Sequence, residues 1–441
     1  MISYKDSGIE WIGEIPGNWK IDKIKYLSNL YGRIGWQGLT SEEYIDEGPF
    51  LVTGVDFCKG EIDWSSCVHI SEKRWKQADK IQLKNNDLLI TKDGTVGKVA
   101  VVDNLDGKAS LNSGVLLIDL NDKNSKKYLY WVLSSDVFWT WFNYKNSGNS
   151  TILHLYQKDF NEFIYAMPSL IEQNKIAYFL DNKCAEIDSI TSKIEKQIRL
   201  LKDYKKSLIT ETVTKGLDKN VPMKDSGIAW IGDIPKHWDI SRIKYKLSLI
   251  GSGSTPDSSD SFNYDGEFNW IQSGDLYKNY YIQETEKTIT KYALNSTKTL
   301  KMYTAPFVVI AMYGASVGNI AISRIDAYAN QACCSMKGDD SLHTNYLFYL
   351  LRASKEQMLM IAIGGTQPNI SQQLLKNLKI IVPMHDEQLK ITDFLDKKCS
   401  EIDSIISKKE RQLDLMKEHR KSLIYEYVTG KKRVGGVDYG N

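Results

Sequence analysis

The chain has 441 residues, of which 42% are hydrophobic and 25% charged, and its formal net charge at pH 7 is only +2. This length predicts about two to four domains, and the composition is typical of a globular protein. No run of eighteen apolar residues occurs and residues 1–20 contain five charged side chains. These features exclude a membrane-spanning helix, argue against a signal peptide and predict a cytoplasmic protein.

The cysteines and histidines suggest no metal site. No two cysteines form a CxxC pair, so the sequence predicts neither a zinc ribbon nor a thioredoxin-like motif. Without a signal peptide, the thiols are expected to be reduced. The six cysteines are Cys58, Cys67, Cys184, Cys333, Cys334 and Cys399, and the six histidines likewise form no cluster along the chain.

The first 26 residues form an arm that recurs in the second half of the chain. KDSGIEWIGEIPGNWKIDKIKY at 5–26 matches KDSGIAWIGDIPKHWDISRIKY at 224–245 at 15 of 22 positions. A repeat whose period is a whole domain indicates a tandem duplication and not a solenoid of short repeats. The repeated tryptophans are predicted to be packing anchors; they are Trp11, Trp19, Trp230 and Trp238.

Each arm is followed by a block that differs between the two halves. Short apolar runs such as LLIT, VAVV and FVVIAM, bounded by Gly, Asn and Asp, predict strands and turns. Each block also contains one stretch predicted as a helix, at 126–142 and at 344–362. We therefore predict an α/β (α+β) fold with two similar domains in tandem: residues 1–169, including the arm at 1–26, and residues 218–383, including the arm repeat at 223–245.

Residues 170–217 and 384–432 are predicted as two long helices, followed by a flexible tail at 433–441. Over 172–214 and 387–429 the two helices are identical at 27 of 43 positions. One apolar stripe runs along each, so each needs a partner, and the two-fold repeat favours an antiparallel coiled coil between them. The predicted seam positions are Ile187, Ile190, Ile194, Leu201, Tyr204 and Leu208 in the first helix and Ile402, Ile405, Lys409, Gln412, Met416, His419 and Leu423 in the second.

Three motifs together resemble the specificity subunits of Type I restriction–modification systems: the arm IEWIGEIPGNWKIDKIKYL at 9–27 with its second copy, EQxKIxxFLDxKCxEIDSI at 172–190 and 387–405, and GGTQPNISQQLLKNLKIIVP at 364–383. The resemblance covers essentially the whole chain. It implies two target-recognition domains, each of which binds one half of a bipartite site on double-stranded DNA. It also implies that the paired helices set the spacing between the half-sites and dock two methyltransferase subunits. S-adenosylmethionine, ATP and Mg²⁺ would then belong to the methyltransferase and restriction/motor partners and not to this chain.

Reading a DNA sequence requires hydrogen-bonding side chains on loops that reach base edges, with cations on the phosphates. GGTQPN at 364–369, GSGSTPDSSDS at 251–261 and the turn at 92–98 have such compositions, although a helix cap at Ser371, a plain surface loop and a hairpin turn explain them as well. The candidate DNA contacts are Arg33, Trp36, Gln37, Lys92, Lys98, Ser150, Thr151, Ser252, Ser254, Thr255, Tyr313, Asn319, Thr366, Gln367 and Asn369.

Charged residues that recur in both helices away from the seam are the candidates for docking partner subunits, although a solvated helix face would explain them equally well. They are Asp181, Lys183, Glu186 and Asp188 with their counterparts Asp396, Lys398, Glu401 and Asp403.

The alternative class is an enzyme, either a DNA methyltransferase or a nuclease with its own catalytic site. An adenine methyltransferase needs a glycine-rich cofactor loop and a catalytic turn that contains Pro-Pro, and no Pro-Pro pair occurs in the chain. The nuclease-like pair Pro256-Asp257 lies in a serine-rich loop and has no matching Asp/Glu-x-Lys on a strand. The sequence therefore predicts a non-catalytic DNA-binding subunit without a metal of its own.

Overall fold

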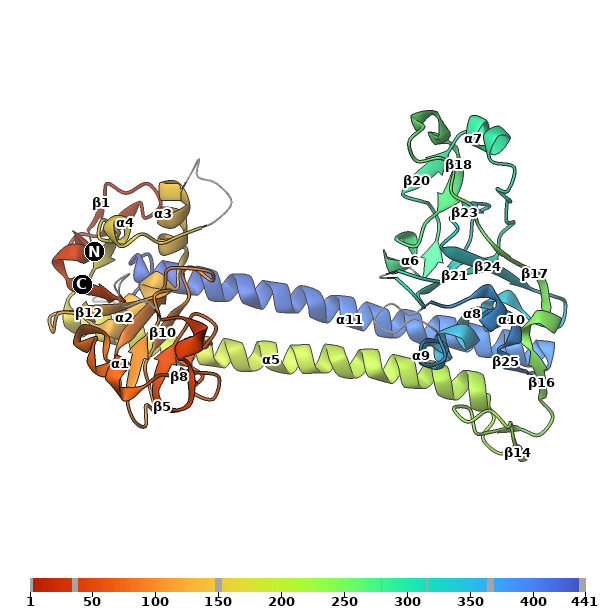
Figure 1. Ribbon diagram of the computed structural model, residues 1–441, viewed down its shortest axis with the longest axis horizontal. Helices are drawn as coiled ribbons and strands as arrows, with labels where there is room; N and C mark the ends of the chain where they lie inside the picture. The colour runs from red at the N-terminus through yellow and green to blue at the C-terminus, as the bar shows by residue number, and fades with distance from the viewer. Residues whose placement is uncertain are drawn as a thin grey trace, which may run out of the picture. The chain divides into compact units, whose positions relative to one another are not determined.

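The computed structural model describes residues 3–33, 39–146, 153–278, 280–314, 316–362 and 369–435. The chain divides into two compact units (Figure 1). Unit 1 consists of Met1–Glu195 and Arg411–Asn441, and unit 2 consists of Lys196–Glu410. Among the described residues, no helix is long and apolar enough to span a membrane.

The globular part of unit 1 is rich in short strands. Its elements are β1 (Tyr4–Asp6), β2 (Glu14–Pro16), β3 (Lys20–Lys23), β4 (Ser28–Gly32), β5 (Ile45–Val52), β6 (Phe57–Cys58), β7 (Glu61–Ile62), β8 (Val68–His69), α1 (Glu72–Lys76), β9 (Leu88–Thr91), β10 (Val99–Val101), β11 (Ala109–Leu111), β12 (Val115–Leu120), α2 (Lys126–Leu133), α3 (Asp136–Asn146), α4 (Gln157–Phe160) and β13 (Ile164–Met167).

The globular part of unit 2 follows the same plan. Its elements are β14 (Met223–Asp225), β15 (Asp233–Pro235), β16 (Asp239–Arg242), β17 (Leu247–Ser252), β18 (Tyr264–Ile271), α6 (Asp275–Lys278), β19 (Tyr281–Ile282), β20 (Lys287–Ile289), α7 (Lys291–Ser296), β21 (Phe307–Ala311), β22 (Ile320–Ser323), β23 (Tyr328–Ala329), β24 (Cys333–Gly338), α8 (Thr344–Ala353), α9 (Lys355–Met360), α10 (Gln372–Asn377) and β25 (Lys379–Val382).

The two units share one sheet topology. The main sheet has the order β10-β9-β12-β4 in unit 1 and β22-β21-β24-β17 in unit 2, where β19 adds a fifth strand beside β22. A second sheet has the order β11-β5-β8 in unit 1 and β23-β18-β20 in unit 2, and its pairs β5/β11 and β18/β23 are both parallel. The prediction of two similar α/β domains is therefore confirmed, although their sequences hardly match in this part.

One helical expectation is wrong in both domains. The stretches predicted as single helices are each broken in two, α2–α3 in unit 1 and α8–α9 in unit 2. A serine lies at each break: the Ser135 hydroxyl donates to the Val132 carbonyl over 2.6 Å, and the Ser354 hydroxyl donates to the Leu351 carbonyl over 3.0 Å. Serine side chains that bond to the preceding turn compete with continuation of the helix.

The long helices are α5 (Leu170–Lys215) and α11 (His385–Val428), and both continue from one unit into the other. Within unit 1, Phe179 packs on Tyr427 with ring centroids 4.4 Å apart, and Asp188 pairs with Arg420 over 2.9 Å. Within unit 2, Lys205 likewise pairs with Asp403 over 2.6 Å. Higher numbers on α5 oppose lower numbers on α11, which confirms the antiparallel pairing inside each unit.

The helices bury only part of the predicted stripe. The predicted seam residues Ile187, Ile194, Ile402 and Leu423 are buried. Ile190 and Ile405 are 41% and 43% exposed and Tyr204 is 57% exposed, so these three seam assignments are wrong. The buried positions Ile187 and Ile198 of α5 are separated by eleven residues, and Ile209, also buried, follows at the same interval. A repeat of eleven residues in three turns lies close to the natural period of an α-helix, whereas the three-and-four spacing of the predicted seam averages 3.5 residues per turn and drifts from it.

The two arms anchor the globular parts to the long helices. Trp19 and Trp238 are fully buried, and their indole N–H groups donate over 3.2 Å to Glu172 of α5 and Glu387 of α11 respectively. The phenol of Tyr128 in α2 donates to the carbonyl of Val428 in unit 1. These contacts fit the packing role predicted for the repeated tryptophans. The same duplicated sequence therefore builds the same joint in each unit.

Candidate nucleic-acid interface

In unit 1, four loops meet at one edge of the main sheet. The turn between β9 and β10 carries Lys92, whose carbonyl accepts from the Leu155 N–H over 2.9 Å and whose N–H donates to the Gly114 carbonyl over 2.8 Å. At the tip of the same turn, the Thr95 hydroxyl donates to the Gly54 carbonyl over 3.2 Å. These bonds hold together segments that are distant in sequence, and the bond between Leu155 and Lys92 joins residues 63 positions apart.

Unit 2 builds the corresponding edge in the same way. The Ile370 N–H donates to the Met312 carbonyl over 2.7 Å, as Leu155 does to Lys92. The Met312 N–H donates to the Ala332 carbonyl, and the Gly253 N–H donates to the Cys333 carbonyl. The loops after β17 and β21 and the loop before α10 therefore lie together, so the structure gathers segments that the sequence analysis had selected one at a time.

Most of the described candidate DNA contacts lie at these two edges. Lys98 and Asn369 are exposed, Tyr313 is 36% exposed and Lys92 is partly buried. Beyond Asn369, the side chain of Ser371 accepts from the Leu374 N–H, so the predicted cap of α10 is present. Partly exposed candidates of unit 2 are Ser252, Ser254 and Thr255, while the candidates Trp36, Gln37, Ser150, Thr151, Thr366 and Gln367 lie outside the described residues.

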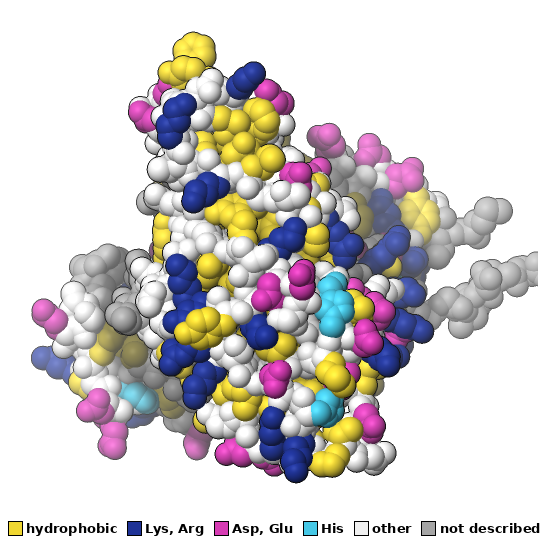
Figure 2. Space-filling view, turned by 90° about the vertical axis from the view of Figure 1, so that its right-hand side faces the viewer, with side chains coloured by type: hydrophobic (Ala, Val, Ile, Leu, Met, Phe, Trp, Pro, Cys, Tyr) yellow, Lys and Arg dark blue, Asp and Glu magenta, His cyan; other side chains and the backbone are white. Residues whose placement is uncertain are grey.

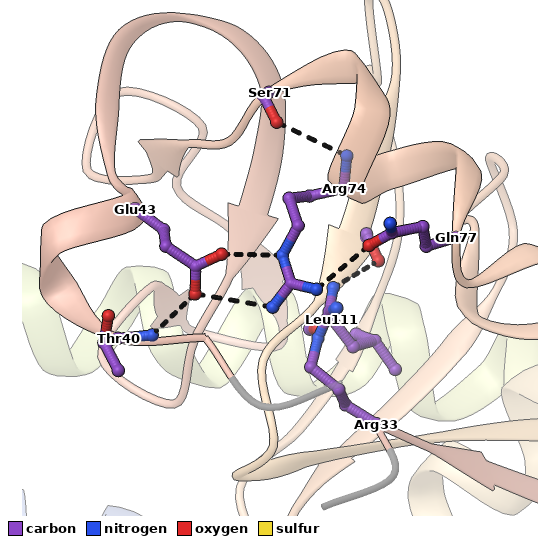
Figure 3. A network of polar contacts seen from close by, with 8 residues as sticks. Arg33, Thr40, Glu43, Ser71, Arg74, Gln77 and Leu111 are labelled. Atoms are coloured by element: carbon purple, nitrogen blue, oxygen red, sulfur yellow. Dashed lines mark hydrogen bonds and ion pairs between the residues drawn. The ribbon is translucent and has the colours of Figure 1, made fainter. Parts of the chain in front are cut away.

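The arrangement around Arg33 does not favour its predicted contact with DNA. Its guanidinium is buried, and it donates to the Leu111 carbonyl over 2.7 Å and to the Ser110 hydroxyl over 3.0 Å. Burial, with a smaller effect of the nearby Arg74 charge, lowers the pKa of Arg33 to about 10. Figure 3 shows this guanidinium close to that of Arg74, which forms an ion pair with Glu43. Arg33 ties β4 to β11 and is not presented to solvent.

Asn319 also has a partner within its own unit. Its side-chain oxygen accepts from the Lys355 ammonium over 2.7 Å, which links the end of the β21–β22 turn to the start of α9. Burial, with a smaller effect of the Arg352 charge, lowers the pKa of Lys355. In this structure Asn319 braces the turn, and Tyr313 is the more exposed of the two candidates on it.

A polar cluster that no sequence motif predicts lies at the edge of unit 1. His154 Nδ1 contacts the carboxylate of Asp93, and the His154 ring lies 4.2 Å from the ring of Tyr156. Lys158 lies over the other aromatic ring, with its ammonium 5.6 Å from the Tyr156 centroid. Asp93 and His154 are 61 residues apart in the chain, so no local motif joins them. The sequence contains one indication of this cluster. Asp93 lies in the predicted turn at 92–98, and His154 lies close to the candidate contacts Ser150 and Thr151.

The charged side chains on one end face of unit 2 do not form a single basic surface. Figure 2 shows one end face of unit 2, where Lys and Arg side chains are interspersed with Asp and Glu, and apolar side chains lie between them. This agrees with the weak net charge of +2. On that face, affinity for a polyanion would depend on individual cations and not on a uniform field.

The comparisons with known proteins identify the family. A profile described as "Type I restriction modification DNA specificity domain" matches residues 34–200 and 235–415, once in each half of the chain. The chain belongs to this family. Type I specificity subunits are DNA-recognition proteins without catalytic activity, so this chain is a recognition subunit and not an enzyme.

Individual relatives and solved structures are similar to the chain over nearly its whole length. The chain is 25% identical over 441 residues to the MjaVIII specificity subunit of a type I restriction enzyme from Methanocaldococcus jannaschii, and the alignment covers 96% of this chain and 95% of that protein. Its fold resembles a chain from a structural study of type I R-M complex assembly and conformational transition, with a TM-score of 0.68, 15% identity, and coverage of 95% of this chain and 99% of the other. The HsdS subunit from Thermoanaerobacter tengcongensis gives a TM-score of 0.53 at 15% identity, with coverage of 95% and 98%.

The candidate docking residues of this specificity subunit fall into two groups. In unit 1, Asp181 accepts from the Trp131 indole over 2.8 Å, and Asp188 is paired with Arg420. In unit 2, Asp396 accepts from the Tyr281 and Tyr349 phenols, and Asp403 is paired with Lys205. These four aspartates hold each unit together. The other four form exposed pairs on the outer helix faces: Lys183 with Glu186 at 2.9 Å, and Lys398 with Glu401 at 2.8 Å.

The repeated cysteines of the long helices are core residues. Cys184 is buried in unit 1 and Cys399 in unit 2. Burial raises the pKa of the Cys184 thiol to about 11 and also raises that of Cys399. Thiols in such surroundings are neutral at physiological pH, and they pack as small apolar side chains.

Proposed function

We propose that the two units of this specificity subunit are separate readers, each binding one half of a bipartite site on double-stranded DNA. Residues 1–169 and 218–383 would be the two target-recognition domains, and the helices at 170–217 and 384–432 would set the spacing between the half-sites. Methylation and cleavage would come from methyltransferase and restriction/motor subunits, which would also hold S-adenosylmethionine, ATP and Mg²⁺. Because the chain would bind cellular DNA, it would act in the cytoplasm.

One observation carries the proposal: the same loop edge occurs twice, with different side chains on it. Leu155 bonds to Lys92 in unit 1 as Ile370 bonds to Met312 in unit 2. The residues at the surface of the two edges nevertheless differ, with Lys98 on one turn and Tyr313 on the other. A duplicated scaffold that keeps its joints but varies its exposed loops is suited to reading two different base sequences.

The exposed pairs on the long helices are the best supported docking sites for methyltransferase subunits. Lys183 and Glu186 recur as Lys398 and Glu401 in the same geometry, one pair in each unit. Two equivalent pairs support two partner copies, because a repeated surface binds a repeated partner. Reversing both charges of one pair should lower the bound partner from two copies to one, as measured by analytical ultracentrifugation.

A domain exchange tests the two-reader proposal. Residues 246–383 are replaced by the corresponding block of a related subunit, and the assembled methyltransferase is assayed on a library of DNA sites. We expect one half-site to change and the other to remain. A change in both half-sites together, or in neither, would refute independent reading.

The spacing role of the helices needs a different change. Insertion of four residues after Ile194 and four after Lys409 lengthens both helices by about 6 Å, at 1.5 Å per residue. That is roughly two base pairs at about 3.4 Å each. We expect a longer preferred spacer with unchanged half-sites. An active complex that keeps its original spacer would show that the helices do not measure the distance.

A further inference from the structure

His154 occupies a fixed place at the loop edge of unit 1. The next residue, Leu155, is buried, and its N–H donates to the Lys92 carbonyl, so the main chain at His154 is held against the β9–β10 turn. The His154 side chain remains 28% exposed. It packs against Tyr156, which is itself half exposed. A ring held by its backbone, by a carboxylate and by a neighbouring ring can present one edge to a ligand.

The contact with Asp93 determines which edge that is. An ionised carboxylate has no proton of its own, so the ring nitrogen in contact with Asp93, Nδ1, is the one that carries a proton. In a neutral imidazole the other nitrogen, Nε2, then has a free lone pair and is an acceptor.

The equivalent position in unit 2 is also polar and exposed. Asn369 directly precedes Ile370, whose N–H bonds to the carbonyl at the start of the β21–β22 turn, just as His154 precedes Leu155. Each unit thus places one side chain with hydrogen-bonding capacity at the same point of its loop edge. The imidazole and the amide differ in chemistry, as two readers of different sequences require.

We propose that His154 is a sequence-determining residue of the first reader and accepts, through Nε2, a hydrogen bond from an exocyclic amino group in the major groove. The donor is adenine N6 or cytosine N4, since these are the amino groups exposed there. Asp93 is the positioning residue, because it fixes the proton on Nδ1 and the direction of the ring. The inference rests on the proposed function, in which unit 1 binds one half-site.

The test removes the amino group from the DNA and the acceptor from the protein. In the first half-site, each adenine is replaced in turn by purine and each cytosine by pyrimidin-2-one, which lack the group. Binding is measured with the full chain assembled with its methyltransferase subunits. We expect wild type to lose about tenfold in affinity at one position, the size of one base-edge hydrogen bond. His154→Phe, which keeps a ring against Tyr156, should show no loss at that position.

Two comparisons separate this role from a structural one. When amino groups are removed from the second half-site, the loss of affinity should be equal in wild type and His154→Phe, because unit 2 would bind that half-site. Asp93→Ala leaves the imidazole in place but frees it to turn, so it should lose most of the discrimination at the same position. It also serves as the second variant if His154→Phe does not fold.

Each outcome decides one question. If wild type prefers its first half-site but His154→Phe shows the same losses as wild type at every position, His154 only braces the loop and the inference is wrong. If no position in the first half-site is sensitive to removal of an amino group, the inference is also wrong, while the two-reader proposal stands. If wild type does not distinguish the first half-site from unrelated DNA, the proposed function itself fails.

Discussion

Replacing Gln388 by leucine should destabilise unit 2 more than the same replacement at an exposed position. The side chain is fully buried and makes three hydrogen bonds: it accepts from the His343 N–H over 2.7 Å and donates to the Ser341 and Pro383 carbonyls over 2.8 and 2.9 Å. Leucine fills a similar volume but leaves one N–H and two carbonyls without these partners. Each buried polar group that loses its partner costs about 1–3 kcal/mol.

At the lower limit the three groups together cost about 3 kcal/mol, which corresponds to a fall in Tm of roughly 6–12 °C for a unit of this size. Calorimetry of the purified chain measures the fall, and hydrogen exchange shows that the loss of protection lies in unit 2. Gln373→Leu is the matched control, because the same change at an exposed position of α10 should alter stability by no more than about 0.5 kcal/mol.

The duplication provides a second check of the same reasoning. Gln173 of unit 1 is buried and bonds to the Ser125 N–H, the Asn124 side chain and the Pro168 carbonyl in a matching pattern. Gln173→Leu should therefore cost a similar free energy, but in unit 1. A Tm change below about 2 °C for Gln388→Leu, or protection lost equally in both units, would refute the argument that these glutamines satisfy buried main-chain groups locally.

Three further predictions follow from the ion pairs and the loop edges. Asp403→Asn should lower the free energy of unfolding in urea by about 3 kcal/mol, because the Lys205 side chain, 7% exposed, loses its counter-charge. Asp188→Asn should lower it by at most about 1 kcal/mol, because its partner Arg420 is 32% exposed. Two lysine ammonium groups lower the pKa of Glu162 to about 2, so its stabilising effect is present above pH 4.5 and is lost as the pH falls toward 2. Over that pH range the urea midpoint of unit 1 should therefore fall less steeply in Glu162→Gln than in the wild type. Lys98→Ala should weaken binding to all DNA sequences and reduce the slope of log affinity against log salt by about 0.9, and a loss confined to one sequence would contradict a phosphate contact.

The sequence by itself determined the architecture, because duplication is visible without structure. Two copies of the arm and of the long helix frame two dissimilar blocks, so two domains and an antiparallel helix pair followed from symmetry and from the need to bury one apolar stripe. The packing role of Trp19 and Trp238 was also predictable, since a large aromatic side chain repeated in both arms stabilises the fold most when it is buried.

Tertiary structure alone decided which polar residues face outward. Arg33 was a candidate DNA contact because it is a cation next to a loop, but its guanidinium donates to the main chain of β11 inside the unit. His154 showed no local motif, because its partner Asp93 comes from a turn 61 residues earlier, and only the folding of the sheet brings the two together. The seam was misjudged at Ile190 for a related reason: the choice between a heptad and an eleven-residue period depends on how two helices pack, which an apolar pattern in one helix does not specify.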